Sequence, residues 1–214
     1  MNKAIYIHGL GGSGSGSSAK NIKKMLETVW PGEYEFSANT YNLLEPKQAF
    51  EQIQKDVKSA DLVIASSLGG FYAVSVPVCT KILLLNPCLE PENAIIKILY
   101  PEQKKEFDEE RAVGEWAEIK KNWNFLDRED CGMRFGVFSD KDELFSFVDT
   151  YKEKFGTCFG TDNFCKICGT HEIAKDEAQL SQALWAFKKY GDCAGKVMAG
   201  QSSYCFEEGK NQLK

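Results

Sequence analysis

The sequence predicts an α/β domain with a mostly parallel sheet of about six strands and helices on both faces. Short apolar runs such as Leu62–Ala65 and Lys81–Leu85 are continuous and do not alternate with polar residues, which indicates strands that are covered on both faces. Along the chain these runs alternate with segments of helical periodicity. That order is typical of a doubly wound domain with right-handed crossovers.

The first strand is expected over Lys3–Ile7, and a Gly/Ser-rich loop follows over residues 9–18. Ser17 or Ser18 is expected to cap the next helix, because serine hydroxyls accept backbone N–H groups at helix starts. The apolar side chains of that helix recur at helical spacing: Ile22, Met25, Leu26 and Val29.

The next elements continue the alternation. In chain order they are a weak strand at Tyr34–Phe36, a helix over residues 47–59, a strand at Leu62–Ala65, a helix from Ser67 to about Pro77, and a strand at Lys81–Leu85. Residues 91–130 are charged and helix-prone, with aromatic residues interspersed. Later elements are a strand at Arg134–Phe138, a helix near residues 145–155, a strand at Phe164–Ile167 and a helix over 174–190.

The chain has 214 residues, which is enough to bury a full core in one domain. We expect this domain over residues 1–190 and a loosely held tail over residues 191–214. A net charge of −5 argues against a nucleic-acid partner. The N-terminal apolar run is too short for a secretory signal, and no segment is long enough to span a membrane. We therefore expect a cytoplasmic protein whose eight cysteines are reduced.

The segment most informative about function joins the strand Leu62–Ala65 to the helix that follows it. Ala65-Ser-Ser-Leu-Gly69 has the small-x-Ser-x-Gly pattern of a nucleophile elbow, a sharp strand-to-helix turn that exposes one serine hydroxyl. Small residues are needed on either side of Ser67, because larger side chains would collide across the turn. The pattern predicts Ser67 as the nucleophile of a hydrolase or acyl transferase.

A serine nucleophile needs a base, and the chain has only two histidines. His171 follows a late strand, which gives the order Ser, Asp, His along the chain that α/β-hydrolases use. Asp142 follows the strand Arg134–Phe138 and is the expected acid, although Asp140 lies only two residues away. His8 ends the first strand, and we expect it to be structural, bonding the backbone near this loop.

An oxyanion hole is expected beside Ser67. In such enzymes one donor is the backbone N–H after the nucleophile, here Leu68, and the other comes from the loop after an early strand, here Leu10. No metal is needed for this chemistry.

Several motifs together resemble the YqiA-like esterases, a small family of α/β-hydrolases that lack the first two strands of larger relatives. The motifs are Tyr6-Ile-His-Gly-Leu10, Ala65-Ser-Ser-Leu-Gly-Gly-Phe-Tyr72, Leu84-Leu-Asn-Pro87, Lys141-Asp-Glu-Leu144 and Gly169-Thr-His171. The resemblance spans most of the chain in the right order. It implies esterase activity on small-molecule acyl esters or acyl thioesters, and no cofactor.

Together these observations predict cleavage of a carboxylic ester or thioester through an acyl-serine intermediate. Residues 91–130 are then placed to form a partial cap, with Trp116 or Trp123 lining an acyl pocket. The alternative is that these helices pack their aromatic residues onto the core.

Three other interpretations compete with this one. Gly9-Leu-Gly-Gly-Ser-Gly14 satisfies the G-x-G-x-x-G pattern of dinucleotide-binding loops, but that pattern arises easily in a Gly/Ser tract. Cys158, Cys165, Cys168 and His171 resemble a zinc cluster; residues three apart on a strand, however, point to opposite faces. A binding protein with this fold and no catalytic turnover is the third interpretation. The oligomeric state is left open by the sequence.

Overall fold

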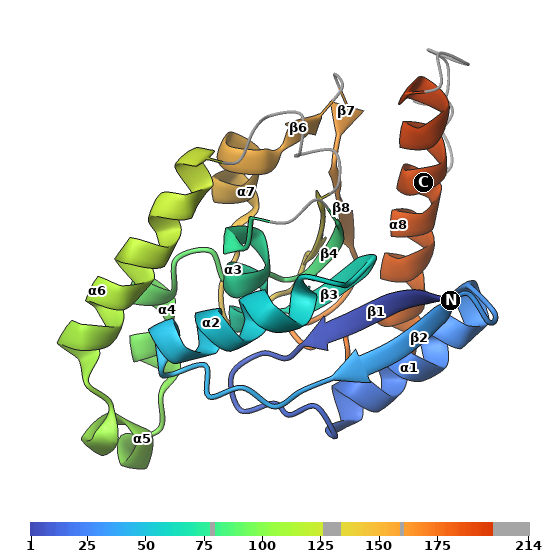
Figure 1. Cartoon of the computed structure of the whole chain (residues 1–214). Helices are drawn as coiled ribbons and strands as arrows, with labels where there is room; N and C mark the ends of the chain where they lie inside the picture. Colours follow the sequence, from blue (N-terminus) through green and yellow to red (C-terminus); the bar gives the residue numbers. More distant parts are fainter. Residues whose placement is uncertain (78–79, 126–133, 159–160, 199–214) are drawn as a thin grey trace.

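A six-stranded parallel sheet forms the centre of the computed structural model (Figure 1). The structure describes residues 1–77, 80–125, 134–158 and 161–198. The strands of the sheet are β1 (Asn2–Ile7), β2 (Tyr34–Ala38), β3 (Leu62–Ser66), β4 (Lys81–Leu85), β5 (Arg134–Ser139) and β8 (Phe164–Ile167). Their order is β2-β1-β3-β4-β5-β8, and every neighbouring pair is parallel. The predicted α/β class and strand number are confirmed.

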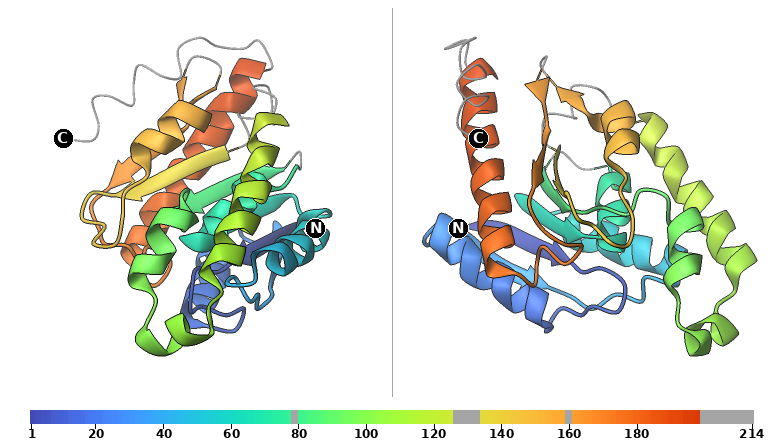
Figure 2. Two further views of the ribbon diagram at one scale, coloured as in Figure 1. Left: turned by 90° about the vertical axis from the view of Figure 1, so that its left-hand side faces the viewer. Right: turned by 180° about the vertical axis from the view of Figure 1, so that it is seen from behind.

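Helices cover both faces of this sheet (Figures 1 and 2). One face carries α1 (Ser17–Val29) and α8 (Glu177–Met198), which pack against each other. The other face carries α2 (Pro46–Val57), α3 (Leu68–Ser75), α4 (Pro91–Ile98), α6 (Glu109–Lys120) and α7 (Val148–Phe155). Shorter elements are α5 (Pro101–Glu106), the 3-10 helix η1 (Lys121–Phe125) and a two-stranded antiparallel pair, β6 (Thr157–Cys158) with β7 (Thr161–Asp162).

Alternate residues of the four inner strands enter two separate hydrophobic clusters. In β1, Ile5 and Ile7 pack with α2 and α3, whereas Ala4 and Tyr6 pack with α1 and α8. The same alternation holds in β3, β4 and β5, whose described residues are almost all buried. Burial on both faces explains why these strands lack a polar alternation in the sequence.

Element boundaries differ from the expectations at several places. Gly16 is the N-cap of α1 and no side chain caps this end, so neither Ser17 nor Ser18 has the predicted capping role. Helix α8 runs to Met198, eight residues beyond the expected end of the last helix. Residues 199–214 of the expected tail, and residues 126–130 of the expected cap, lie outside the described residues.

Ion pairs connect α6, in the segment between β4 and β5, to α2 and to α4. Arg111 of α6 forms a bidentate pair with Glu45 at the start of α2, and Lys120 pairs with Glu92 of α4 at 2.9 Å. Helix α6 therefore packs against α2 and α4. The α4–α5 junction lies beyond these contacts, toward the carboxyl ends of the strands (Figure 1).

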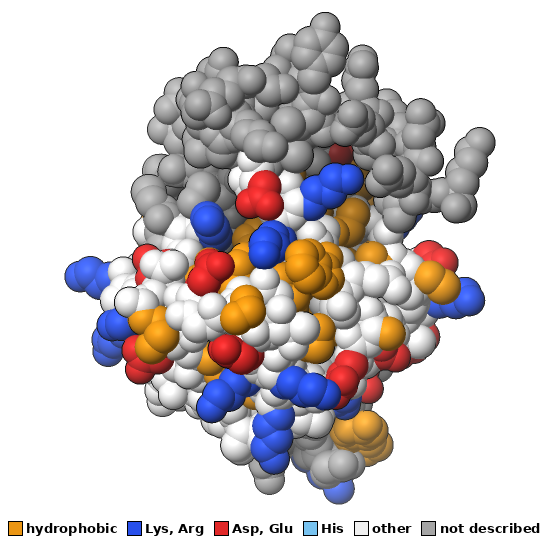
Figure 3. Space-filling view, turned by 90° about the vertical axis from the view of Figure 1, so that its right-hand side faces the viewer, with side chains coloured by type: hydrophobic (Ala, Val, Ile, Leu, Met, Phe, Trp, Pro, Cys, Tyr) orange, Lys and Arg blue, Asp and Glu red, His pale blue; other side chains and the backbone are white. Residues whose placement is uncertain are grey.

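The face formed by α1 and α8 mixes charged residues with scattered hydrophobic side chains (Figure 3). Lys24 of α1 pairs with Glu177 of α8 at 2.7 Å. The Lys188 ammonium lies 5.8 Å from the Trp30 ring and 5.1 Å from the half-exposed Trp185 ring. Within the described part of the chain, none of the helices has the length and apolarity that crossing a membrane requires.

Candidate active site

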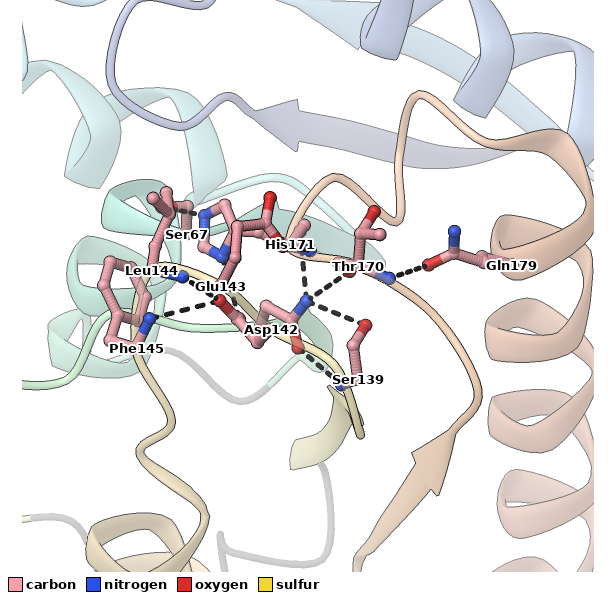
Figure 4. Close-up of polar contacts among 10 residues, drawn as sticks. Ser67, Ser139, Asp142, Glu143, Leu144, Phe145, Thr170, His171 and Gln179 are labelled. Atoms are coloured by element: carbon pink, nitrogen blue, oxygen red, sulfur yellow. Dashed lines mark hydrogen bonds and ion pairs between the residues drawn. The ribbon is translucent and has the colours of Figure 1, made fainter.

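Three of the predicted site residues meet at the carboxyl edge of the sheet. Ser67 directly follows β3, Asp142 lies in the loop after β5, and His171 lies in the loop after β8. Parallel strands end at the same edge, so these loops are brought side by side although they are far apart in the chain. Figure 4 shows the three side chains lying in a row.

The turn at Ser67, which joins β3 to α3, has a strained backbone. Its backbone angles are φ 50° and ψ −123°, and residues other than glycine rarely adopt a positive φ of this kind. Hydrogen bonds hold this conformation: the Ser67 N–H donates to the Leu85 carbonyl at 3.0 Å, and the Ser67 carbonyl accepts from the Gly70 and Cys88 N–H groups at 2.9 Å. The strained serine is therefore fixed by β4 and α3.

Close packing explains the small residues around the elbow. A Cβ atom on Gly69 would lie 2.4 Å from the His8 carbonyl oxygen and 2.6 Å from that of Ile7. A Cβ atom on Gly9 would lie 3.0 Å from the Ser67 Cβ. Absence of a side chain at both positions lets the loop after β1 lie directly against the elbow.

The side chains form a continuous hydrogen-bonded series. His171 Nε2 lies 3.0 Å from Ser67 Oγ, and His171 Nδ1 lies 2.8 Å from Asp142 Oδ2. Only 8% of the His171 side chain and 4% of the Asp142 side chain are exposed. With Nδ1–H donating to the carboxylate, Nε2 is left as an acceptor facing the serine hydroxyl, which is the arrangement that proton removal requires.

Asp142 is held in its charged form. Burial acts to raise the pKa of this carboxyl group. The hydrogen bond and charge of His171 and the N–H groups of Leu144 and Phe145 outweigh burial and hold the pKa below its ordinary value. One oxygen of Asp142 thus anchors the carboxylate to its own loop, and the other orients the imidazole.

Two neighbouring acids fix the His171 loop through its backbone. Asp140 accepts the Gly169 N–H at 3.0 Å, and Glu143 accepts the His171 N–H at 3.0 Å. The geometry thus separates the two candidate acids: Asp142 contacts the imidazole and Asp140 the peptide of Gly169. Glu143 was missed by sequence reasoning, because an exposed Glu beside an Asp carries no signal of what it binds.

His8 is the first residue of the loop that follows β1. Its Nδ1 is 2.7 Å from the Gly9 carbonyl oxygen, and its Nε2 is 3.0 Å from the Tyr41 backbone N. The Tyr41 N–H donates, so Nε2 must be unprotonated and the imidazole neutral. Burial lowers the pKa of His8, and the weaker opposing influence is the bond to Gly9. The prediction that His8 bonds the backbone near this loop is confirmed.

Acid should therefore weaken the fold through His8. Below about pH 6.5 the imidazole takes up a proton in the unfolded chain but resists protonation in the folded one. The free energy of unfolding therefore decreases as the pH is lowered. We expect urea midpoints of the wild type and His8→Gln to converge between about pH 7 and pH 5. His171 is present in both proteins, so its contribution cancels. Parallel curves would contradict the assignment of a buried neutral imidazole.

Ser67 and His171 open into a groove of about 530 Å³. Its walls include Gly9, Leu10, Ile98, Tyr100, Leu144 and Lys175. Tyr100 and Leu144 are among the exposed large hydrophobic residues, with 67% and 44% of their surface accessible. The α4–α5 junction thus supplies one wall of the groove.

Trp116 and Trp123 do not line this groove. Trp116 is fully buried and its indole N–H donates to the Tyr72 hydroxyl at 3.0 Å. The Trp123 indole N–H donates to Ser75 Oγ at 2.8 Å. Both indoles pack onto α3, so the expectation that they form an acyl pocket gives way to the alternative of core packing. The aromatic content of the sequence alone did not distinguish an acyl pocket from core packing.

The metal-cluster interpretation conflicts with the geometry of His171. Both ring nitrogens are engaged, one by Asp142 and the other by Ser67. Cys165 and Cys168 are free thiols, and burial raises the pKa of Cys165 to about 12. The described residues contain no group of three or more His, Cys, Asp or Glu side chains placed to hold a metal ion. The side chain of Cys158 lies outside the described ones.

The sheet order, the strained serine turn and the loop positions define an α/β-hydrolase fold. Solved structures share this fold. One is alpha/beta hydrolase domain-containing protein 10 from mouse, with 15% sequence identity, coverage of 91% of this chain and 90% of that chain, and a TM-score of 0.55. Another is the esterase domain of a Rhodothermus marinus protein, with 13% identity, coverage of 87% of each chain and a TM-score of 0.55. The thioesterase domain from the curacin biosynthetic pathway also matches (11%, 86% and 90%, 0.50). At sequence identities this low, the similarity to these structures concerns the fold alone.

The sequence profile of the uncharacterised protein family UPF0227 matches residues 3–146, about two thirds of the chain. The chain belongs to this family, which confirms the YqiA-like family assignment made from its motifs. A comparison with curated proteins finds no match.

Proposed function

We propose that this protein is a serine hydrolase that cleaves carboxylic esters or thioesters through an acyl-serine intermediate. The observation that carries the proposal is the series Ser67–His171–Asp142, in which a strained serine faces the unprotonated nitrogen of an oriented imidazole. Nucleophile, base and orienting acid occupy the geometric roles of an acyl-transfer site. The α/β-hydrolase fold supports the same class.

The first half-reaction follows from this geometry. His171 Nε2 takes the Ser67 hydroxyl proton as Oγ attacks the substrate carbonyl, and Asp142 stabilises the resulting imidazolium. Leu68 begins α3 and Leu10 lies in the loop packed against Ser67, so their N–H groups are the proposed donors to the oxyanion. Collapse of the tetrahedral intermediate leaves the acyl group on Oγ, and the leaving alcohol or thiol takes the proton from His171. Water then releases the acid by the same steps in reverse.

The groove supports a small-molecule substrate. Ile98, Tyr100 and Leu144 give it apolar wall segments close to the nucleophile, and glycine and serine residues of the loop after β1 give it a polar side. An apolar acyl chain fits the apolar wall, and a polar leaving group fits the polar side. The solved relatives include both an esterase domain and a thioesterase domain, so both linkages belong in the assay.

A fluorophosphonate probe tests the nucleophile directly. We expect covalent labelling of the wild type and complete loss of labelling in Ser67→Ala, because the phosphonate reacts only with an activated serine. Ser66→Ala is the matched control, since it removes the adjacent hydroxyl and leaves the His171 contact in place; we expect it to label. Hydrolysis of p-nitrophenyl esters and acyl thioesters of graded chain length should follow the labelling.

Each outcome of this experiment separates the candidate functions. Labelling that survives in Ser67→Ala would remove Ser67 as the nucleophile. A folded wild type that neither labels nor hydrolyses any ester or thioester would indicate a binding protein that retains the fold without acyl transfer.

A further inference from the structure

Asn86 stands at the end of β4, in the sheet position between the strand that carries Ser67 and the strand that leads to Asp142. The residue is 3% exposed and adopts φ 44°, the only described non-glycine residue besides Ser67 with positive φ. Its backbone N–H donates to the Val137 carbonyl at 2.8 Å. A buried polar residue in a strained conformation at this edge calls for a physical reason.

The carboxamide of Asn86 joins the two loops that carry the acid and the base. Its Oδ1 accepts the Ser139 N–H at 2.7 Å, and its Nδ2 lies 3.0 Å from Ser139 Oγ. The same Nδ2 lies 3.1 Å from the Thr170 carbonyl oxygen and 3.0 Å from the His171 carbonyl oxygen. One buried side chain therefore binds the start of the Asp142 loop and the backbone of the catalytic histidine.

Asparagine is the residue type that these contacts require. One side needs an acceptor for an N–H, and the other needs a donor facing two carbonyl oxygens. Aspartate has the same shape but would place a carboxylate oxygen against both carbonyls. Glycine would relieve the left-handed backbone but would leave both carbonyls without this donor.

We propose that Asn86 is a positioning residue that sets the distance between Asp142 and His171. The inference rests on the proposed hydrolase function and extends it to a residue that touches neither substrate nor the reacting atoms. Asn86 does not line the groove. Its loss therefore displaces the imidazole relative to Ser67 Oγ and leaves substrate contacts unchanged.

Two variants separate the carboxamide from the backbone conformation. We expect Asn86→Asp and Asn86→Gly each to lower kcat for p-nitrophenyl ester hydrolysis about 100-fold, since small misplacements of a catalytic group cost that much. KM should stay within about threefold of the wild type, because substrate contacts are retained. A wild-type kcat in Asn86→Gly would overturn the proposal, because only the backbone conformation would then matter.

Asn163 provides a matched control at the opposite end of β8. It is fully buried, and its Nδ2 donates to the Phe155 carbonyl oxygen at 2.7 Å. Asn163→Asp should lower thermal stability by an amount comparable to Asn86→Asp, with an unchanged kcat per folded molecule. Equal loss of kcat in both variants would overturn the proposal, because destabilisation alone would then explain the effect of Asn86.

A magnetic resonance measurement tests the positioning role without relying on turnover. Because the chain contains only two histidines, ¹⁵N-histidine labelling yields signals from His8 and His171 alone. We expect a slowly exchanging Nδ1 proton of His171 in the wild type, lost in Asn86→Asp and Asn86→Gly, with the His8 signals retained. A retained His171 signal in both variants would overturn the proposal. An unreactive wild type that showed this dependence would refute the hydrolase function and leave the positioning role intact.

Discussion

Asp142→Asn is expected to reduce kcat/KM by about 10⁴-fold while the protein stays folded. The N–H groups of Leu144 and Phe145 bind one side-chain oxygen of Asp142 at 2.9 and 3.1 Å. In the variant the amide oxygen stays with these donors, so the amide NH₂ faces His171 Nδ1. Nδ1 then becomes an acceptor and Nε2 carries the proton, which leaves no acceptor for the Ser67 hydroxyl.

Asp140→Asn is the matched control for this prediction. The same substitution two residues earlier leaves an oxygen to accept the Gly169 N–H, so we expect less than about a tenfold change in kcat/KM. Steady-state kinetics with a p-nitrophenyl ester, corrected for folded protein by circular dichroism, measures both. A larger loss in Asp140→Asn than in Asp142→Asn would reverse the assignment of the acid.

Gly69→Ala is expected to lower the free energy of unfolding by about 3 kcal/mol and the Tm by about 6–12 °C. The added Cβ would lie 2.4 and 2.6 Å from the carbonyl oxygens of His8 and Ile7. These are backbone atoms of the inner strand β1 and of the residue that follows it, so the overlap can be relieved only by moving β1 away from α3. That movement would also separate Leu10 from Ser67, and activity should fall with stability.

Gly114→Ala gives the opposite expectation for the same chemical change. Gly114 lies on the exposed side of α6, and no atom lies within 4 Å of an added Cβ. Alanine in a helix interior restricts the unfolded chain, so we expect stabilisation of about 0.5–1 kcal/mol and unchanged activity. Urea unfolding followed by tryptophan fluorescence measures both variants. Comparable stability changes in the two would contradict the proposed steric clash at the elbow.

The strand positions were predictable because these strands are buried on both faces. All residues of Leu62–Ala65 and Ile82–Leu85 are buried and apolar, and a short, continuous apolar run between turn residues is typical of a strand in the middle of a parallel sheet. The sharp turn after β3 was predictable because Gly69 must lack a side chain, a requirement that the sequence displays directly. The positions of His171 and Asp142 follow from the parallel sheet, which brings strand ends to one edge.

Other features depend on three-dimensional packing that leaves no local pattern. Asn86 reads in the sequence as a turn residue before Pro87, yet its role arises from loops that lie 53 and 85 positions further along the chain. Trp116 and Trp123 could face a groove or the core with the same sequence. Gly16 caps α1 without a side chain although two serines follow it, because the loop geometry and not the residue type decides the cap.

Ser67 and His171 lie 104 positions apart in the chain, and this separation has a consequence for folding. His171 comes within reach of Ser67 only when β4, β5 and β8 are all in the sheet, since His171 follows β8, the edge strand that pairs with β5. Non-local contacts of this kind form late and are lost together when the sheet comes apart. Contact between His171 and Ser67 therefore reports on molecules whose sheet is fully assembled.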